Sequence, residues 1–184
     1  MKGYLLGIFI VVFCFSGTVQ AQEIKWMSMN EALEAQKKKP KKIFMDAYTI
    51  WCGPCKKLDS YTFANKDVAQ YINKHYYPVK FNAEGTEKIK YRDMTFGNPE
   101  YDPNRRGRNS SHQFARAMKI TAYPSLVFFD EEGGWLGPIP GFRTPHQLEI
   151  LLKLFKDEDY KKITTPEAFQ EYSQNFEYEF EVSQ

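Results

Sequence analysis

Two cysteines stand three positions apart in the segment Trp-Cys-Gly-Pro-Cys-Lys, residues 51–56. Cysteines at this spacing serve metal binding, a structural disulfide or thiol–disulfide exchange. A structural zinc site needs four ligands, and the three histidines of the chain have no metal-ligand spacing. A bridge from Cys52 to Cys55 closes so short a loop that it constrains little of the unfolded chain. The pattern favours exchange, and a copper-carrying module that uses both thiolates and a histidine stays open as an alternative.

The two sulfurs are expected to differ in reactivity. Cys52 and Cys55 lie on one side of a predicted helix that begins at the pair, and the free N–H groups and dipole of a helix N-terminus favour an anion on the first cysteine. Cys52 is therefore the predicted nucleophile toward a disulfide. Cys55 is predicted to resolve the mixed disulfide that results. The reduced Cys52–Cys55 pair holds the two electrons itself and becomes a disulfide when it gives them up, so no further cofactor and no metal is expected.

The sequence around the pair resembles thioredoxin. The shared features are WCGPCK after a strand, an Asp six residues before the first cysteine, and an aromatic-Pro step before a later apolar strand. The resemblance covers most of residues 40–157. The segment DSYTF, followed by NKDVAQYI, is also similar to the thioredoxin-like domain of membrane thiol–disulfide interchange proteins. This resemblance implies a thioredoxin-like α/β fold and dithiol–disulfide exchange.

Two charged residues acquire expected roles from the resemblance. Asp46 is expected to be buried beneath the cysteines, where burial raises the pKa of a carboxyl group and lets it accept the proton of Cys55. Lys80 falls on the neighbouring strand and is expected to modulate the charge of Asp46. The alternative for Asp46 is a core residue whose carboxyl group is simply satisfied by a hydrogen bond. The alternative for Lys80 is an ordinary solvated lysine.

Substrate binding is expected at a rim around the cysteines. The resemblance implies a cis peptide bond between Tyr123 and Pro124, which leaves the Tyr123 backbone free to pair with an extended substrate. The other expected rim residues are Trp51, Gly53, Pro54 and Gly141. Tyr123 is bulkier than the residue usual before that proline. Ser60 stands where thioredoxin has a proline that kinks the active-site helix.

Hydrophobic periodicity, caps and turn residues predict alternating helices and strands. Strands are predicted at residues 42–48, 78–82, 125–130 and 135–139, the last two forming a hairpin. Helices are predicted at residues 30–38, 53–61, 66–75 and 112–119, from residue 145, and in a C-terminal extension from about residue 164. The predicted N-caps are Asn30, Asn65, Ser111 and Thr144. The expected fold is a central mixed β-sheet with helices on both faces.

Residues 84–111 are predicted to be an insertion or a long loop, because glycines and prolines interrupt them throughout. One interpretation is a surface that selects partners. The other is that Tyr91, Phe96 and Tyr101 pack a satellite core. The basic cluster from Arg105 to Arg108 is more typical of a solvated face than of an anion-binding site.

Residues 1–21 have the features of a cleavable signal peptide: Lys2, an apolar run from Leu5 to Phe15, and small residues before Gln22. Acylation of Cys14 in a lipoprotein is a weaker alternative. One thioredoxin-like domain is expected over residues 22–184. Export implies an oxidising, periplasmic compartment, where a dithiol tends to become a disulfide.

The chain has 25 basic and 23 acidic side chains, a balance that gives no indication of nucleic-acid binding. The sequence therefore predicts an exported thiol–disulfide oxidoreductase that reduces client proteins. A membrane dithiol protein is the expected electron donor. A disulfide oxidase or isomerase is the alternative of the same class, and a metallochaperone-type binding module is the alternative of a different class.

Overall fold

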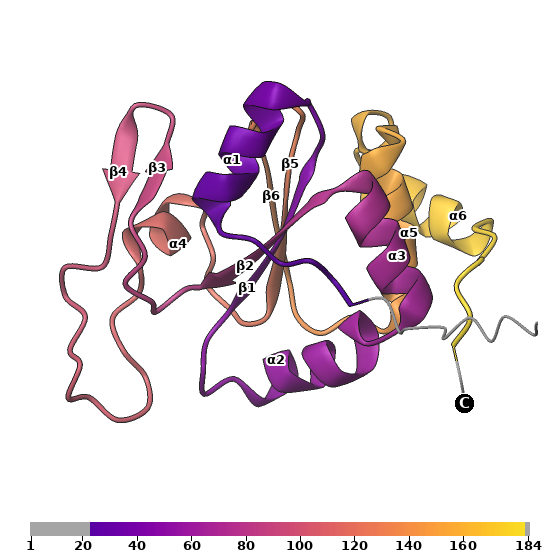
Figure 1. The fold of residues 1–184 in the computed structure, drawn as a ribbon. Helices are drawn as coiled ribbons and strands as arrows, with labels where there is room; N and C mark the ends of the chain where they lie inside the picture. The colour runs from indigo at the N-terminus through magenta and orange to yellow at the C-terminus, as the bar shows by residue number, and fades with distance from the viewer. Residues whose placement is uncertain (1–22, 183–184) are drawn as a thin grey trace, which may run out of the picture.

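The computed structural model describes residues 23–182 and contains a mixed four-stranded sheet of order β2-β1-β5-β6 (Figure 1). The first central strand, β1 (Ile43–Tyr48), runs parallel to β2 (Tyr77–Asn82) and antiparallel to β5 (Ser125–Phe129). β5 pairs antiparallel with β6 (Trp135–Pro140), so the predicted hairpin is confirmed. The expected α/β fold with a central mixed sheet is confirmed as well.

Helices cover both faces of the sheet (Figure 1). On one face lie α1 (Met29–Lys38) and α4 (Gln113–Ala117). On the other lie α2 (Gly53–Lys57) with its continuation η1 (Leu58–Phe63), α3 (Lys66–His75) and α5 (Pro145–Lys156).

Strand β1 shows how the sequence builds these two layers. Side chains alternate along a strand, so Ile43 and Met45 face the α1 side while Phe44 faces the α2 side. All three are fully buried, and each such side chain contributes about 1.5–3 kcal/mol to folding. Asp46 shares the face of Phe44, which places a carboxyl group in the apolar layer beneath α2.

Two predicted helix starts were wrong by one or two residues. Ser28, not Asn30, caps α1, because its hydroxyl accepts a hydrogen bond from the Glu31 N–H while the Glu31 carboxylate accepts one from the Ser28 N–H. The cap of α4 is His112, not Ser111: its Nδ1 accepts from the Phe114 N–H at 3.0 Å. The predicted caps Asn65 and Thr144 are confirmed.

The active-site helix is longer and less regular than predicted. Its α-helical part ends at Lys57, and the chain continues as a π-helix to Phe63 instead of ending at residue 61. The wide turns fall around Ser60, at the position of the proline that kinks the helix in thioredoxin. Thr62 ties this end of the helix down by donating a hydrogen bond of 2.6 Å to the Arg143 carbonyl.

The segment of residues 84–111 is only partly a loop. It contains a small antiparallel hairpin, β3 (Ile89–Tyr91) and β4 (Met94–Phe96), that the sequence did not predict. Tyr91 and Phe96 are buried and pack edge-on against Phe114 of α4, so the packing interpretation is right for these two rings. It is wrong for Tyr101, which is 39% exposed. Residues 97–111 return to α4 as an outlying loop (Figure 1).

After α5 come a short 3₁₀ turn η2 (Asp159–Lys161) and α6 (Pro166–Gln174), the helix expected in the C-terminal extension. The chain then returns to α5, where the buried Glu149 carboxylate accepts hydrogen bonds from the N–H groups of Glu179 (2.8 Å) and Phe180 (3.1 Å). Lys153 pairs with Glu149 at 2.8 Å. The C-terminal tail is therefore fixed by a buried ion rather than by apolar contacts alone.

The Glu149→Ala substitution is expected to lower the free energy of unfolding by about 1–3 kcal/mol, since it leaves the N–H groups of Glu179 and Phe180 without their acceptor and removes one of the two carboxylates paired with Lys153. Urea denaturation measures the loss, and limited proteolysis should cut the tail faster. Glu171→Ala, on the exposed side of α6, is the matched control and should leave the urea midpoint unchanged. An unchanged midpoint in Glu149→Ala would show that the tail does not depend on this carboxylate.

Candidate active site

The cysteine pair lies where the α-helical turn begins after β1. Cys52 is the N-cap of α2, and its Sγ accepts a hydrogen bond of 3.1 Å from the Cys55 N–H. The two sulfurs form a disulfide, and each cysteine is only 2% exposed. Gly53 and Pro54, between them, are exposed. The N–H on Cys52 Sγ is the donor that would stabilise a thiolate there after reduction.

Asp46 is completely buried in β1 and lies opposite Lys80 of β2 in the parallel ladder. The Lys80 ammonium donates to Asp46 Oδ2 at 2.6 Å, while Oδ1 has no hydrogen-bond partner among the described residues. Burial raises the pKa of Asp46 to about 6, because it outweighs the opposing pull of Lys80. This carboxyl group can therefore take up or release a proton near neutral pH.

Lys80 is shared by two carboxylates. Its ammonium also pairs with Asp59 of η1, and it lies over the rings of Trp26, Tyr48 and Phe63 at 4.9–5.3 Å. Burial lowers the pKa of Lys80, but the two carboxylates outweigh it and the pKa is raised. Lys80 is thus held in place rather than solvated. Sequence reasoning missed Asp59, although its position four residues after Cys55 places it one helical turn further along.

The rim opposite the helix is formed by the turn that enters β5. The peptide bond between Tyr123 and Pro124 is cis, as the resemblance implies. The Gly141 N–H donates to the Pro124 carbonyl at 2.8 Å, and Gly141 has φ of +96°, a conformation that favours glycine. The Tyr123 ring meets the Trp51 ring edge-on, with 6.0 Å between centroids. Trp51 and Tyr123 thus contact one another across this rim.

The loop of residues 97–111 is fastened to Trp51. Glu84 is buried, and its Oε2 accepts hydrogen bonds of 2.8 Å from the Trp51 Nε1–H and from the Asn109 N–H. The Arg108 guanidinium lies over the Trp51 ring, 4.4 Å from its centroid. Arg108 is exposed, as the interpretation of a solvated face expects, but its contact with Trp51 ties it to the cysteine site. Sequence reasoning missed Glu84 and Arg108, because nothing in their spacing connects them with residue 51.

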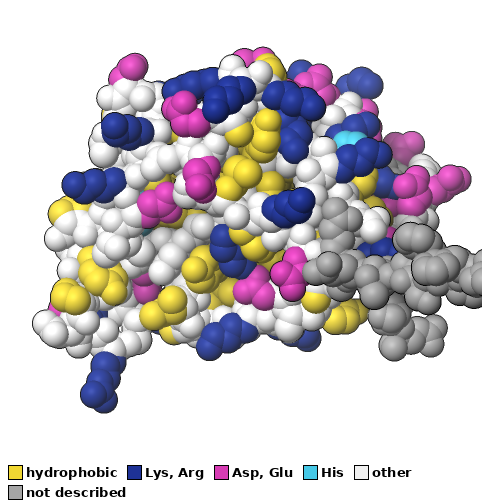
Figure 2. Space-filling view, in the orientation of Figure 1, with side chains coloured by type: hydrophobic (Ala, Val, Ile, Leu, Met, Phe, Trp, Pro, Cys, Tyr) yellow, Lys and Arg dark blue, Asp and Glu magenta, His cyan; other side chains and the backbone are white. Residues whose placement is uncertain are grey.

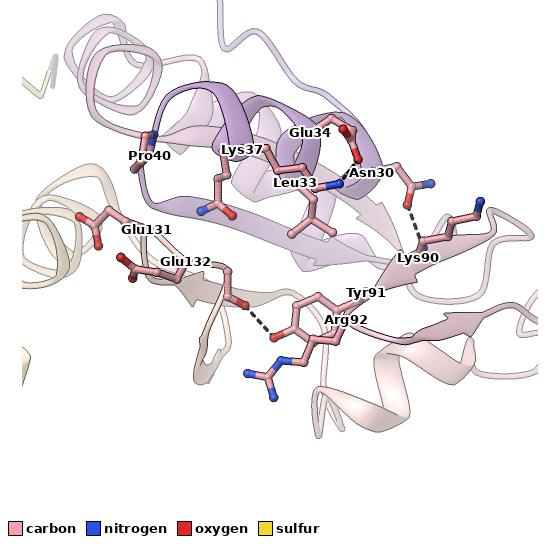
Figure 3. Close-up of a pocket in the computed structure, with 12 residues that line it drawn as sticks. Asn30, Leu33, Glu34, Lys37, Pro40, Lys90, Tyr91, Arg92, Glu131 and Glu132 are labelled. Atoms are coloured by element: carbon pink, nitrogen blue, oxygen red, sulfur yellow. Dashed lines mark hydrogen bonds and ion pairs between the residues drawn. The ribbon is translucent and has the colours of Figure 1, made fainter.

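A hollow of about 840 Å³ lies away from the cysteine pair. It is bounded by α1, by β3 and by the turn before β6, and the hydroxyl of Tyr91 reaches across it to the Gly133 carbonyl (Figure 3). None of its lining residues belongs to the cysteine site. A smaller hollow of about 320 Å³ does border the site, between the exposed Ile50 and the loop residues Tyr101 and Arg105.

Residues 23–182 contain neither a cluster of metal ligands nor a membrane-spanning helix. In this part of the chain no group of three or more histidine, cysteine or carboxylate side chains is arranged to hold a metal ion. The same residues include no helix with the length and apolar character that crossing a membrane requires. The expected signal peptide and Cys14 lie outside the described residues.

A mixed sheet, a Cys-Gly-Pro-Cys pair at a helix N-terminus and a cis-proline turn together define a thioredoxin-like thiol–disulfide oxidoreductase. The sequence profile of the thioredoxin-like domain matches residues 29–156, and the chain belongs to this family.

Relatives and solved structures agree with this assignment. The chain is 28% identical over 111 residues to the thiol:disulfide interchange protein DsbD of Haemophilus ducreyi, an alignment of 58% of this chain and 15% of that protein. A thioredoxin-fold protein from Helicobacter pylori superposes with a TM-score of 0.56 at 17% identity, over 73% of this chain and 81% of the other. A candidate disulphide isomerase from Bacteroides thetaiotaomicron gives 0.52 at 28% identity, over 73% and 94%.

Proposed function

We propose that this protein is an exported reductase of protein disulfides that works through Cys52 and Cys55. The observation that carries the proposal is the placement of a protonatable carboxyl group, Asp46, on the sheet face that α2 covers, with the Cys55 N–H directed at Cys52 Sγ. The Cys55 N–H favours the thiolate of the attacking Cys52, and the Asp46 carboxylate can receive the proton of the resolving Cys55.

The reaction consists of two exchanges. The Cys52 thiolate attacks a client disulfide, forms a mixed disulfide and expels one client sulfur as a thiolate. Cys55 then passes its proton to Asp46, directly or through a water, and attacks Cys52 Sγ, which expels the second client thiolate. Two electrons have moved to the client, and the protein is left with the Cys52–Cys55 disulfide. Lys80, between Asp46 and Asp59, sets how readily Asp46 accepts that proton.

Client binding is proposed at the rim described above. An extended client segment would pair with the backbone of Tyr123, beside the cis bond to Pro124, while its disulfide lies against Cys52. Trp51, Gly53, Pro54 and Gly141 would form the remaining contacts. The supporting observations are the exposure of Gly53 and Pro54 and the contact between Trp51 and Tyr123.

Export and the electron donor complete the proposal. Residues 1–21 have the composition of a signal peptide, and an exported reductase needs a supply of electrons. The chain is similar to a thiol:disulfide interchange protein but spans only 15% of its length. We propose a separate membrane dithiol protein as the donor.

Trapping tests the proposal. The Cys55→Ser variant removes the resolving thiol, so mixed disulfides between Cys52 and clients should accumulate in cells and separate on non-reducing gels. The same adducts should disappear in a Cys52→Ser, Cys55→Ser double variant. Client proteins that are reduced when isolated from wild-type cells and oxidised in cells without the protein would establish the direction. A Cys55→Ser protein that traps nothing would contradict the proposal.

A disulfide oxidase or isomerase is the second candidate, favoured by the similarity to the candidate isomerase of Bacteroides thetaiotaomicron. The reduction potential separates the two, since a value well above about −200 mV is typical of disulfide donors. A copper carrier would need a histidine beside the thiolates. His112 uses both ring nitrogens in hydrogen bonds, to the Glu87 carbonyl and from the Phe114 N–H, and His146 contacts the C-terminal tail.

A further inference from the structure

Two aromatic side chains near the cysteine pair each have a cation over the ring. Trp51, directly before Cys52, lies beneath the Arg108 guanidinium at 4.4 Å. Phe142, directly after Gly141, lies beneath the Lys57 ammonium at 5.2 Å. The cations come from different elements, the loop of residues 97–111 and the active-site helix α2. The rim around the disulfide therefore combines flat apolar surfaces with positive charge on more than one side.

Both cations are exposed, and neither forms an ion pair with a carboxylate of residues 23–182. Two acidic groups of the site are already occupied by other partners. Glu84, at the Nε1 edge of the Trp51 ring, is buried and accepts two N–H groups, and Asp59 is paired with Lys80. Lys and Arg side chains project below α2 and at the tip of the long loop (Figure 2). An approaching client therefore meets cations that lack a partner.

We propose that the rim made by Arg108 and Lys57 selects client segments that carry carboxylates beside the reacting cysteine. This inference rests on the proposed disulfide exchange and adds the chemistry of the preferred client. An Asp or Glu next to the client cysteine would pair with Arg108 or Lys57, and the apolar parts of the segment would lie on Trp51 and Phe142. Lys or Arg at the same positions would be repelled. Rim charges of this kind act mainly on the rate of encounter and on choice among partners.

The Trp51 ring restricts the orientation of the cation that selects the client. A guanidinium over an indole ring is held in a defined plane, so its N–H groups are pre-oriented for a carboxylate and lose less freedom on binding. The hydrogen bonds of Glu84 to Trp51 and Asn109 fix the ring and the loop that bears Arg108 relative to each other. Arg106 is also exposed in the same loop but lies over no aromatic ring of the described chain. It provides a matched control.

The experiment uses three synthetic peptides with one internal disulfide and acidic, basic or neutral residues beside the attacked cysteine. Reduction by the full mature chain, recycled with dithiothreitol, gives kcat/KM for each peptide. Neighbouring charge also alters the intrinsic reactivity of a disulfide. The ratio of acidic to basic kcat/KM is therefore compared between protein variants, where that intrinsic difference cancels.

Arg108→Glu and Lys57→Glu are each expected to lower the acidic-to-basic ratio by about tenfold, and Arg106→Glu by less than about twofold. The wild-type ratio should fall toward its intrinsic value in 0.5 M salt, since exposed charges are screened. Unchanged ratios in both Arg108→Glu and Lys57→Glu would overturn the inference, and so would an equal fall in Arg106→Glu. Failure of the wild-type protein to reduce even the neutral peptide would instead refute the proposed function.

Discussion

The Cys52→Ser substitution is expected to reduce the rate of insulin reduction by dithiothreitol to that of dithiothreitol alone. A serine hydroxyl ionises far above neutral pH and cannot form a disulfide, so the first exchange has no nucleophile. Cys55→Ser should also stop turnover, but it should still combine with one equivalent of a disulfide substrate. This asymmetry is the signature of one attacking and one resolving thiol.

Alkylation provides the independent readout. In reduced Cys55→Ser protein, Cys52 should react with iodoacetamide with a pH midpoint clearly below that of a free cysteine, about 8.5, because Cys52 is the N-cap of α2. In Cys52→Ser protein, Cys55 should react slowly at neutral pH. Equal and slow alkylation of the two thiols would contradict the assigned roles.

The Asp46→Asn substitution is expected to stabilise the oxidised protein at pH 7 while it slows turnover. Burial raises the pKa of Asp46 from 3.8 to about 6, so the folded state binds this proton more tightly than the unfolded state. The corresponding stability is complete below about pH 4 and is lost as the pH rises through 6, in all about 3 kcal/mol. An asparagine side chain does not ionise, so the Asp46→Asn variant does not lose this stability as the pH rises.

The free energy of unfolding from urea titrations at pH 4 and pH 7 tests this sign. The free energy of unfolding of Asp46→Asn should exceed that of the wild type by up to about 3 kcal/mol at pH 7, and the two values should converge near pH 4. Insulin turnover of the variant at pH 7 should fall about tenfold or more, because Cys55 loses its proton acceptor. A variant that is no more stable than wild type, or that turns over normally, would show that Asp46 is an ordinary core residue.

The fold was predictable where local signals are strong. The strand around Asp46, the Thr144 cap with Gln147, and the two cysteines with their glycine and proline each act through neighbours in sequence. The hairpin β3–β4 was missed because its strands have three residues each and its turn includes Arg92 at φ of +53°, where glycine or asparagine is usual.

The site was predictable only as far as the resemblance to thioredoxin extends. Asp59 and Glu84 contact Lys80 and Trp51 across 21 and 33 positions of the chain. No periodicity encodes such pairs, because they depend on how η1 and the start of the insertion pack against the sheet. The contact of Arg108 with Trp51 was missed, since an arginine cluster in a segment interrupted by glycines and prolines gives no indication of the ring beneath it.

The attachment of the long loop has an evolutionary and practical consequence. Residues 97–111 form no strand of the sheet and meet the active-site turn through Glu84, Asn109 and Arg108. Variation in this segment leaves the ladder between β1 and β5 intact, so the contribution of Arg108 to the proposed client recognition can change without altering the cysteine pair. A protein engineer who grafts a different loop between β4 and α4 should obtain a retargeted reductant with the original sulfur chemistry.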